Sequence, residues 1–194
     1  MKKTLLFIAT LIALSTSAQK TNSVRFNGGH AFFGTGDLKG IYFSTEYQKQ
    51  LTKLFSVGAE FGVSSATSQY NYVVNKEKEI LYFSTQNAYK INLNGFLNLI
   101  NTEKHLAQIG SGLSGRIGYR YSTGGFTTTV DKNGKIIYLL DNGNYRKGNQ
   151  IGLIVNLSYA YKISSGWSLF GRGALQIYET NLDNLIGGGI GYSF

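Results

Sequence analysis

The sequence predicts an all-β fold, an eight-stranded antiparallel up-and-down barrel that crosses a membrane. Three observations support this prediction. Apolar and polar residues alternate with a period of two along eight segments, as they do in strands with two different faces. Short connections alternate with longer ones, as they do between the two ends of a transmembrane barrel. The 194 residues include no Pro, which fits strands whose backbone N–H groups all pair.

The composition excludes several classes of protein. Charged residues make up 15% of the chain, below the roughly 25% of a typical soluble domain, and 25 residues are Gly. The 12 Phe and 14 Tyr residues exclude intrinsic disorder, and the lack of Cys excludes a disulfide scaffold, thiol catalysis and Cys-type zinc sites. The net charge of +9 suits anionic partners, but the Lys and Arg residues are scattered, so nucleic acid is not expected. We expect neither a metal nor a cofactor.

Residues 1–18 are predicted to be a secretory signal peptide. Lys2 and Lys3 precede an apolar run over residues 5–14, and small residues lead to a cleavage point after Ala18. Ten mainly apolar residues are too few to cross a membrane as a helix, which takes about 20. Residues 19–194 are therefore expected to form the barrel domain of an exported protein.

The alternation predicts eight strands of about the length that crosses the apolar part of a membrane. In chain order they are Val24–Phe33, Ile41–Leu51, Phe55–Ser64, Tyr89–Leu99, Ala107–Tyr121, Ile151–Lys162, Trp167–Tyr178 and Leu185–Phe194. The sixth strand is the clearest, because every odd position from Ile151 to Tyr161 is large and apolar or aromatic. In the fourth strand, Ile91 and Leu93 alternate with the polar residues Lys90, Asn92 and Asn94.

The connections fall into two groups that we assign to opposite ends of the barrel. Short turns are expected near Thr52–Leu54, Asn101–Lys104 and Ser164–Gly166, and longer loops near residues 34–40, 65–86, 122–149 and 179–184. Within the longest loop, Thr127–Leu139 is predicted to form a hairpin around Asp131-Lys132-Asn133-Gly134, because Asn-Gly readily adopts the positive φ angles of tight hairpin turns.

The apolar face of each strand is predicted to meet lipid, and the polar face to fill the lumen. The alternation alone leaves open a soluble lipocalin-like barrel with the apolar face inside. However, the polar face is rich in Gly, as expected where eight strands leave little room for side chains. Aromatic residues such as Tyr159 and Tyr161 lie toward strand ends on the apolar face, which is the pattern of interfacial girdles.

The last residues are Gly189-Ile190-Gly191-Tyr192-Ser193-Phe194. This ending resembles the C-terminal β-signal of bacterial outer-membrane barrels, although Gly187 stands where the signal usually has a polar residue. The chain as a whole resembles the small OmpA/OmpX-like outer-membrane β-barrel proteins. The resemblance implies a place in the outer membrane of a Gram-negative-type envelope, among its lipids. It also implies that the barrel-assembly machinery reads Gly189, Tyr192 and Phe194. We expect a monomer.

Seven charged residues fall on the polar face and are therefore predicted to lie in the lumen: Arg25, Glu46, Glu60, Lys90, Arg116, Arg120 and Arg172. Glu46 lies seven residues before Lys53 and Glu60 seven after it, so they are expected nearly opposite each other on adjacent strands. Two carboxylates that close repel each other unless a cation lies between them or one is protonated. We therefore predict that Arg172 or a neighbouring Arg lies between them, either in a polar plug or in the gate of a narrow ion channel.

The outer mouth of the barrel is predicted to be basic. Lys90, Arg116 and Arg120 are expected near the loop end, and the loop cations outnumber the loop acids. These loop residues are Lys132, Lys135, Arg146 and Lys147, against Asp131 and Asp141. This charge suits the phosphates of lipopolysaccharide, or it is ordinary solvated loop charge.

Catalysis is not expected, although some eight-stranded barrels acylate or deacylate lipid A. Such chemistry needs a nucleophilic hydroxyl, a His base and usually a carboxylate. The chain has only His30 and His105, both predicted to face lipid, and neither is in a His-x-Ser pair. Thr45 could lie across from His30, but no outward carboxylate is near. The sequence therefore favours a structural or surface-interaction role through extracellular loops; a narrow channel is the alternative, and a lipid-modifying enzyme is less favoured.

Overall fold

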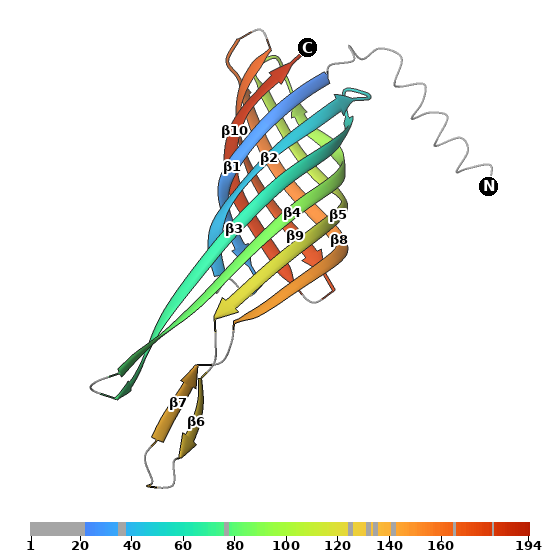
Figure 1. Ribbon diagram of the computed structural model, residues 1–194. Helices are drawn as coiled ribbons and strands as arrows, with labels where there is room; N and C mark the ends of the chain where they lie inside the picture. Colours follow the sequence, from blue (N-terminus) through green and yellow to red (C-terminus); the bar gives the residue numbers. More distant parts are fainter. Residues whose placement is uncertain are drawn as a thin grey trace, which may run out of the picture.

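The computed structural model describes residues 22–34, 38–75, 78–123, 126–130, 133, 136–140, 143–164, 166–179 and 181–194. Eight of the strands in these residues close into an antiparallel barrel with the order β1-β10-β9-β8-β5-β4-β3-β2 (Figure 1). The barrel strands are β1 (Asn22–Phe33), β2 (Leu38–Gln50), β3 (Phe55–Asn75), β4 (Lys78–Asn101), β5 (His105–Thr123), β8 (Asn144–Lys162), β9 (Trp167–Tyr178) and β10 (Leu182–Ser193). The predicted fold class is confirmed. The predicted signal peptide lies outside the described residues.

The first and last barrel strands pair along their whole length, so the barrel has no open edge in the part that would cross a membrane. Ser23 lies opposite Ser193 at one end of this seam, and Phe33 opposite Asp183 at the other. Asn22 and Phe194, the first and last residues that the structure describes, therefore lie at the end of the barrel that carries the short turns (Figure 1). Closure of this kind pairs every strand N–H and C=O, which hydrocarbon requires.

The short turns are built by local hydrogen bonds that their sequences provide. The Thr52 hydroxyl accepts hydrogen bonds from the backbone N–H groups of Leu54 (3.2 Å) and Phe55 (3.0 Å), and the Thr102 hydroxyl accepts one from His105 N–H (3.0 Å). Gly166 in the third turn has a φ of 94°, which favours glycine. Because the turns are tight, they fix the register of the strands that they join.

Two of the predicted loops are wrong for much of their length, because the strands continue through them. β3 and β4 remain paired from Ala66 opposite Gln86 as far as Asn75 opposite Lys78. β5 and β8 remain paired as far as Ser122 opposite Asn144. These segments lie beyond the barrel and need no apolar face toward lipid, so their residues keep strand pairing without the alternation by which strands were recognised.

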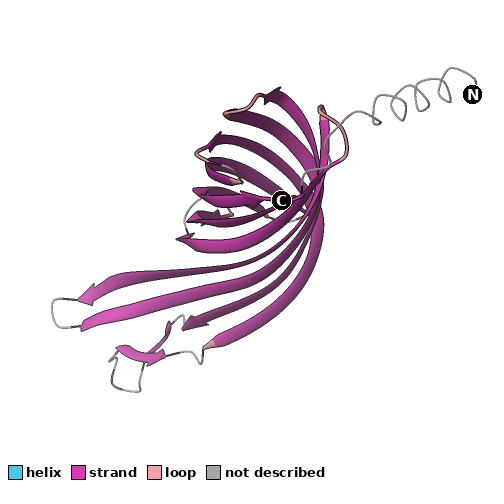
Figure 2. Cartoon of the chain, turned by 90° about the horizontal axis from the view of Figure 1, so that it is seen from above, coloured by secondary structure: helices cyan, strands magenta, loops and turns pink. Residues whose placement is uncertain are grey.

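The result is a four-stranded sheet, β3-β4-β5-β8, that projects beyond the barrel (Figures 1 and 2). β2 stops pairing with β3 at Ala66, whereas β3 continues to Asn75, a further rise of about 30 Å at about 3.3 Å per residue. We call this part the projecting sheet. The predicted hairpin in the longest loop is confirmed: β6 (Phe126–Val130) pairs with β7 (Ile136–Leu140) in a separate two-stranded sheet.

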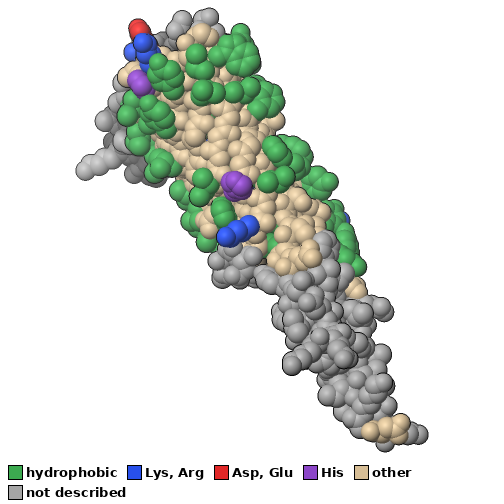
Figure 3. Space-filling view, turned by 90° about the vertical axis from the view of Figure 1, so that its left-hand side faces the viewer, with side chains coloured by type: hydrophobic (Ala, Val, Ile, Leu, Met, Phe, Trp, Pro, Cys, Tyr) green, Lys and Arg blue, Asp and Glu red, His purple; other side chains and the backbone are tan. Residues whose placement is uncertain are grey.

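The two faces of the barrel strands differ as predicted. In β8, Leu157 is 61% exposed on the outside, whereas its neighbour Asn156 is 1% exposed inside. Hydrophobic side chains are spread over the outer surface of the barrel, with few charged ones among them (Figure 3). The lipocalin-like alternative, with an apolar interior and a polar exterior, is therefore wrong. Among the described residues, none forms a helix of the length and hydrophobicity that spanning a membrane requires.

Candidate functional site

The centre of the lumen holds two carboxylates that share one guanidinium. β2 and β3 place Glu46 directly opposite Glu60. Arg172 on β9 reaches across the lumen and donates to both oxygens of Glu60 at 2.8 Å, and its Nη1 lies 3.8 Å from Glu46. Asn156 accepts two further hydrogen bonds from Arg172. All four side chains are buried. We call Glu46, Glu60 and Arg172 the central cluster.

A second charged cluster lies nearer the loop end of the lumen. The Oδ2 atom of Asp183 accepts hydrogen bonds from Lys90 Nζ (3.0 Å) and Arg116 Nη1 (2.8 Å). Lys90 also donates to Gln176 (2.6 Å), and Arg116 also donates to Gln150. Asp183 is 0% exposed. We call Lys90, Arg116 and Asp183 the upper cluster.

Sequence reasoning missed Asp183, which it assigned to the loop before Leu185. β10 begins three residues earlier than predicted, at Leu182. A usable signal was present: the inward alternation of Gly191, Gly189 and Gly187 continues backward through Leu185 to Asp183. A second signal was that Lys90 and Arg116 were predicted to lie in the lumen without any carboxylate to pair with them.

Neutral polar side chains connect the two clusters. Asn92 donates to Glu60 (2.8 Å) and accepts from Ser114 (2.6 Å) and Gln176 (3.2 Å). Ser114 also hydrogen-bonds the Tyr178 hydroxyl at 2.8 Å. Buried polar groups cost free energy unless they are paired, and this chain of hydrogen bonds satisfies most of the polar atoms at this level.

The lumen also contains apolar side chains, which the polar-face prediction did not anticipate. They form a buried cluster of Ala31, Phe33, Tyr42, Ala66, Ile154, Ala174 and Leu185. Lys90 Nζ lies 5.3 Å from the centre of the Phe33 ring, and the Arg116 guanidinium lies 4.6 Å from the Tyr178 ring. Charged groups, hydrogen-bonded amides and packed rings thus fill successive levels of the described lumen from the central cluster to the upper cluster.

Six of the seven residues predicted in the lumen are buried there, and Arg120 is not. Arg120 lies on the projecting sheet, exposed and directly opposite Arg146. Arg120 lies on the face of β5 that lines the lumen within the barrel. At the height of Arg120, however, β9 no longer pairs with β8, so the barrel does not enclose this residue. The prediction that Lys90 and Arg116 contribute to a basic mouth is also wrong, because both are buried against Asp183.

The remaining mouth residues divide into exposed and undescribed ones. Arg146 and Lys147 are exposed on β8, and Lys147 Nζ lies 5.6 Å from the centre of the Tyr119 ring. The other predicted loop charges lie outside the described residues: Asp131, Lys132, Lys135 and Asp141.

Neither His has the surroundings of a catalytic base. His30 is exposed on the outer face between Ile41 and Ile186 in the register, and Thr45 lies opposite Phe26, so the considered pairing of Thr45 with His30 is wrong. His105 lies at the turn end, where its Nδ1 is 2.6 Å from the Tyr159 hydroxyl. In the described part of the chain, no group of three or more His, Asp or Glu is placed to hold a metal ion.

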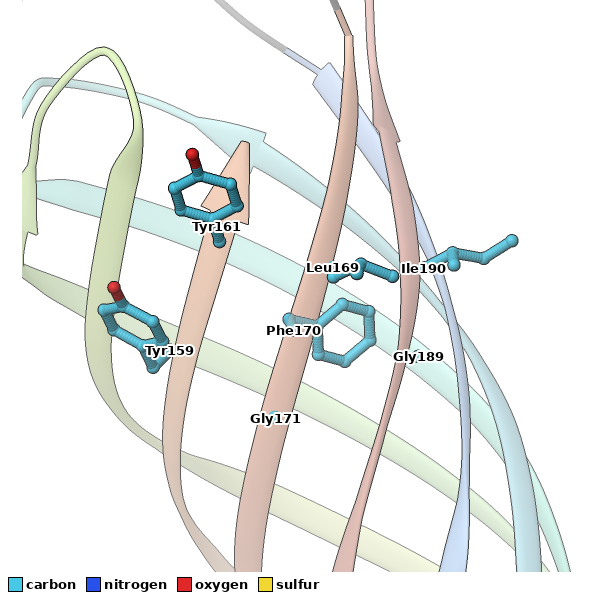
Figure 4. Close-up of a pocket in the computed structure, with 7 residues that line it drawn as sticks. All are labelled: Tyr159, Tyr161, Leu169, Phe170, Gly171, Gly189 and Ile190. Carbon is cyan, nitrogen blue, oxygen red and sulfur yellow. The ribbon is translucent and has the colours of Figure 1, made fainter. Parts of the chain in front are cut away.

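The lipid-facing surface has a shallow groove where β9 lacks side chains. Gly171 leaves open space on the outside of the strand, and the groove beside it has a volume of about 470 Å³ (Figure 4). Tyr159, Tyr161, Leu169 and Ile190 lie around it. The lining is mainly apolar, so the groove offers contact to acyl chains and no reactive group.

The residues of the predicted assembly signal lie along β10 and at the chain end. Gly189 faces the lumen opposite Asn27, whereas Tyr192 and Phe194 are exposed on the outer face with ring centres 6.3 Å apart. The Trp167 ring lies 5.0 Å from that of Tyr192. These rings form part of an aromatic rim at the turn end of the barrel.

No protein-family model matches the sequence, and no curated protein matches it. The fold does match solved structures. Neisserial surface protein A is 12% identical with a TM-score of 0.59, over 89% of this chain and 97% of that protein. Ail of Yersinia pestis, solved with the heparin analogue sucrose octasulfate, is 10% identical with a TM-score of 0.56, over 91% of this chain and all of Ail.

The N-terminal barrel domain of Pseudomonas aeruginosa OprF is 12% identical with a TM-score of 0.53, over 91% of this chain and all of that domain. At these identities the likeness concerns the fold alone. Strand number, antiparallel closure, outward apolar face and near-complete coverage all agree with the resemblance found in the sequence. In its fold, the chain is therefore similar to the small eight-stranded outer-membrane β-barrel proteins.

Proposed function

We propose that this chain is a non-enzymatic outer-membrane protein that works as a surface-interaction protein: the barrel is a sealed anchor, and the projecting sheet with its loops is the contact surface. One observation carries the proposal. From the central cluster to the upper cluster, the described lumen is closed by paired and packed side chains, while four strands continue beyond the barrel as a sheet. The short turns, with Asn22 and Phe194 beside them, then face the periplasm, and the projecting sheet faces the outside of the cell.

The charge of the projecting sheet suggests the chemistry of its partner. Arg120 lies directly opposite Arg146 on one face of the sheet, Lys147 lies opposite Tyr119 on the other face, and all three cations are exposed. Residues 84–89, 117–122 and 143–150 contain no Asp or Glu. Like charges directly opposite each other in a sheet are destabilising, and an anion between them removes that cost. A saccharide that carries phosphate or sulfate groups fits, and the complex of Ail with sucrose octasulfate supports this choice. Lipopolysaccharide in the same membrane and sulfated glycans outside it share this chemistry.

The triple variant Arg120→Gln/Arg146→Gln/Lys147→Gln is expected to bind polyanions about tenfold more weakly than the wild type, because exposed charges each contribute up to about 1 kcal/mol. Binding of heparin and of purified lipopolysaccharide, each measured with the protein in nanodiscs, separates the two sources. The matched control is Lys49→Gln/Lys53→Gln/Lys104→Gln, which removes the same charge from exposed positions at the turn end. Equal affinity of the two triple variants for both probes contradicts the proposed surface.

The sealed lumen predicts that the protein does not conduct ions. In planar lipid bilayers, the wild type, Arg172→Ala and Glu60→Gln are all expected to stay at baseline conductance, because the upper cluster and the packing around Ile154 still block the lumen. An eight-stranded barrel has room for its side chains but not for a water-filled pore. Stepwise currents that change with either substitution would instead support the gated channel.

Two further features belong to this proposal. Gly189, Tyr192 and Phe194 serve as the signal by which the barrel-assembly machinery recognises the chain, and the exposed rings of Tyr192 and Phe194 leave it accessible. The protein works as a monomer surrounded by outer-membrane lipid, since the closed seam leaves no barrel strand that requires a partner.

A further inference from the structure

The turn end of the lumen contains a polar cavity that the proposed function does not use. Its volume is about 270 Å³, and its lining includes Arg25, Gln48, Gln108, Lys162 and Trp167. The central cluster closes the lumen above it, and the short turns surround its mouth. We call this cavity the vestibule.

The residues that line the vestibule carry a net positive charge. They include two cations, Arg25 and Lys162, and no Asp or Glu. Glu46 lies opposite Arg25 in the register, and its carboxylate interacts electrostatically with Arg25 as well as with Arg172, whose Nη1 lies 3.8 Å away. Arg25 is 4% exposed, lies 5.5 Å from the centre of the Phe170 ring, and forms no ion pair with a carboxylate of the described residues. A buried guanidinium that makes no direct ion pair is costly unless further acceptors reach it.

Hydrogen-bond donors accumulate around this cation. Gln48 is 4% exposed, and its Nε2 atom has no hydrogen-bond partner. Lys162 Nζ donates one hydrogen bond to the Thr102 carbonyl at 2.8 Å, and an ammonium has three donors. A buried donor without a partner costs about 1–3 kcal/mol, so a ligand that accepts from Gln48 recovers this cost.

We propose that the vestibule is a binding site for a small oxyanion, a carboxylate or phosphate group of a periplasmic small molecule, held by Arg25 and Gln48. A guanidinium binds both groups with two parallel charge-assisted hydrogen bonds. The volume lies just below the range of about 300–1,000 Å³ for small-molecule pockets, so the ligand is small. The short turns of outer-membrane barrels face the periplasm, which makes that compartment the source. This site lies at the opposite end of the barrel from the projecting sheet and is independent of its role.

Binding at this site is measured by isothermal titration calorimetry, because the ring of Trp167, the only Trp, lies on the outer rim against Tyr192. Acetate and inorganic phosphate are titrated separately into the purified full-length protein in detergent, at constant ionic strength set with NaCl, while the heat of binding is recorded. A saturable change with acetate, phosphate or both supports the site, and the more effective anion identifies the ligand group.

Arg25→Gln is expected to weaken that saturable binding at least about tenfold, since a hydrogen bond to a charged group contributes about 1.5–3 kcal/mol. Gln48→Leu, which removes the donor without changing charge, is expected to weaken it less. Arg120→Gln is the matched control, because it removes the same charge from the other end of the molecule and should bind like the wild type. Far-UV circular dichroism establishes that each variant is folded, and Gln48→Leu carries the test if Arg25→Gln does not fold.

Any one of three results overturns the proposal. The first is that neither anion produces a saturable change beyond that of NaCl. The second is that folded Arg25→Gln binds the anion with the affinity of Arg120→Gln, and the third, if Arg25→Gln does not fold, is that Gln48→Leu binds it with the wild-type affinity. Each of these results leaves the heparin and lipopolysaccharide measurements on the projecting sheet unaffected.

Discussion

Arg172→Met is expected to lower the free energy of unfolding by about 3–5 kcal/mol, because it leaves two buried carboxylates without their cation. Glu60 loses both hydrogen bonds from the guanidinium, and Glu46 loses the charge 3.8 Å away. Glu60 is 3% exposed and Glu46 is 1% exposed, so little solvent stabilises their charges in place of Arg172. Met has a similar length and keeps most of the packing. Equilibrium urea unfolding in lipid vesicles, followed by Trp167 fluorescence, measures the change.

Two controls separate the missing charge from the missing side chain. Arg120→Met removes an exposed Arg and is expected to change stability by no more than about 0.5 kcal/mol. Glu46→Gln/Glu60→Gln/Arg172→Met removes all three charges, and most of the lost stability should return, since replacing a whole buried ionic group is often neutral. A loss below about 1 kcal/mol for Arg172→Met, or no recovery in the triple variant, would show that the central cluster does not hold the lumen together.

The position of the central cluster could be predicted because tight turns carry register information. The turn after Leu51 fixes how β2 and β3 pair, so equal distances from it place Glu46 and Glu60 opposite each other. Arg172 reaches the two carboxylates from β9. This contact was predicted because Arg172 lies about as far from its own turn as Glu46 and Glu60 lie from theirs. Strand positions within the membrane followed from the alternation, because lipid outside and a narrow lumen inside impose opposite demands on successive residues.

The sequence predictions failed for residues that do not lie between lipid on one side and a narrow lumen on the other. Beyond Ala66 the strands extend past the barrel, where the alternation ends although pairing continues, and the projecting sheet was predicted to be loop. The prediction for Arg120 gave the correct face of β5 but the wrong position along the barrel axis, because alternation indicates only the face on which a residue lies. Inside the lumen, Ile154 interrupted the polar face of β8 in the sequence. In three dimensions it packs with Phe33 and Leu185, and no single strand contains that information.

Gly189→Ala is expected to destabilise the barrel by about 3 kcal/mol, the upper part of the range for overpacking, because it obstructs the seam between β1 and β10. A Cβ at Gly189 would overlap the carbonyl oxygen of Phe26 on β1 and lie 2.8 Å from its carbonyl carbon. These are backbone atoms, which cannot rotate away as a side chain can. The two strands must therefore separate where the barrel closes. Urea unfolding of the variant refolded into vesicles measures the loss.

Gly173→Ala is the matched control, since a Cβ at that position on β9 meets no atom within 4 Å and should leave stability nearly unchanged. Refolding into vesicles without any assembly factor isolates the steric effect of Gly189 from its proposed part in the assembly signal. Phe194→Ala is expected to leave stability in vesicles nearly unchanged, because the Phe194 side chain is 60% exposed on the outer rim. If Gly189→Ala matches Gly173→Ala in vesicles, the seam tolerates a side chain there, and the need for glycine at this position has to come from recognition during assembly rather than from closure of the barrel.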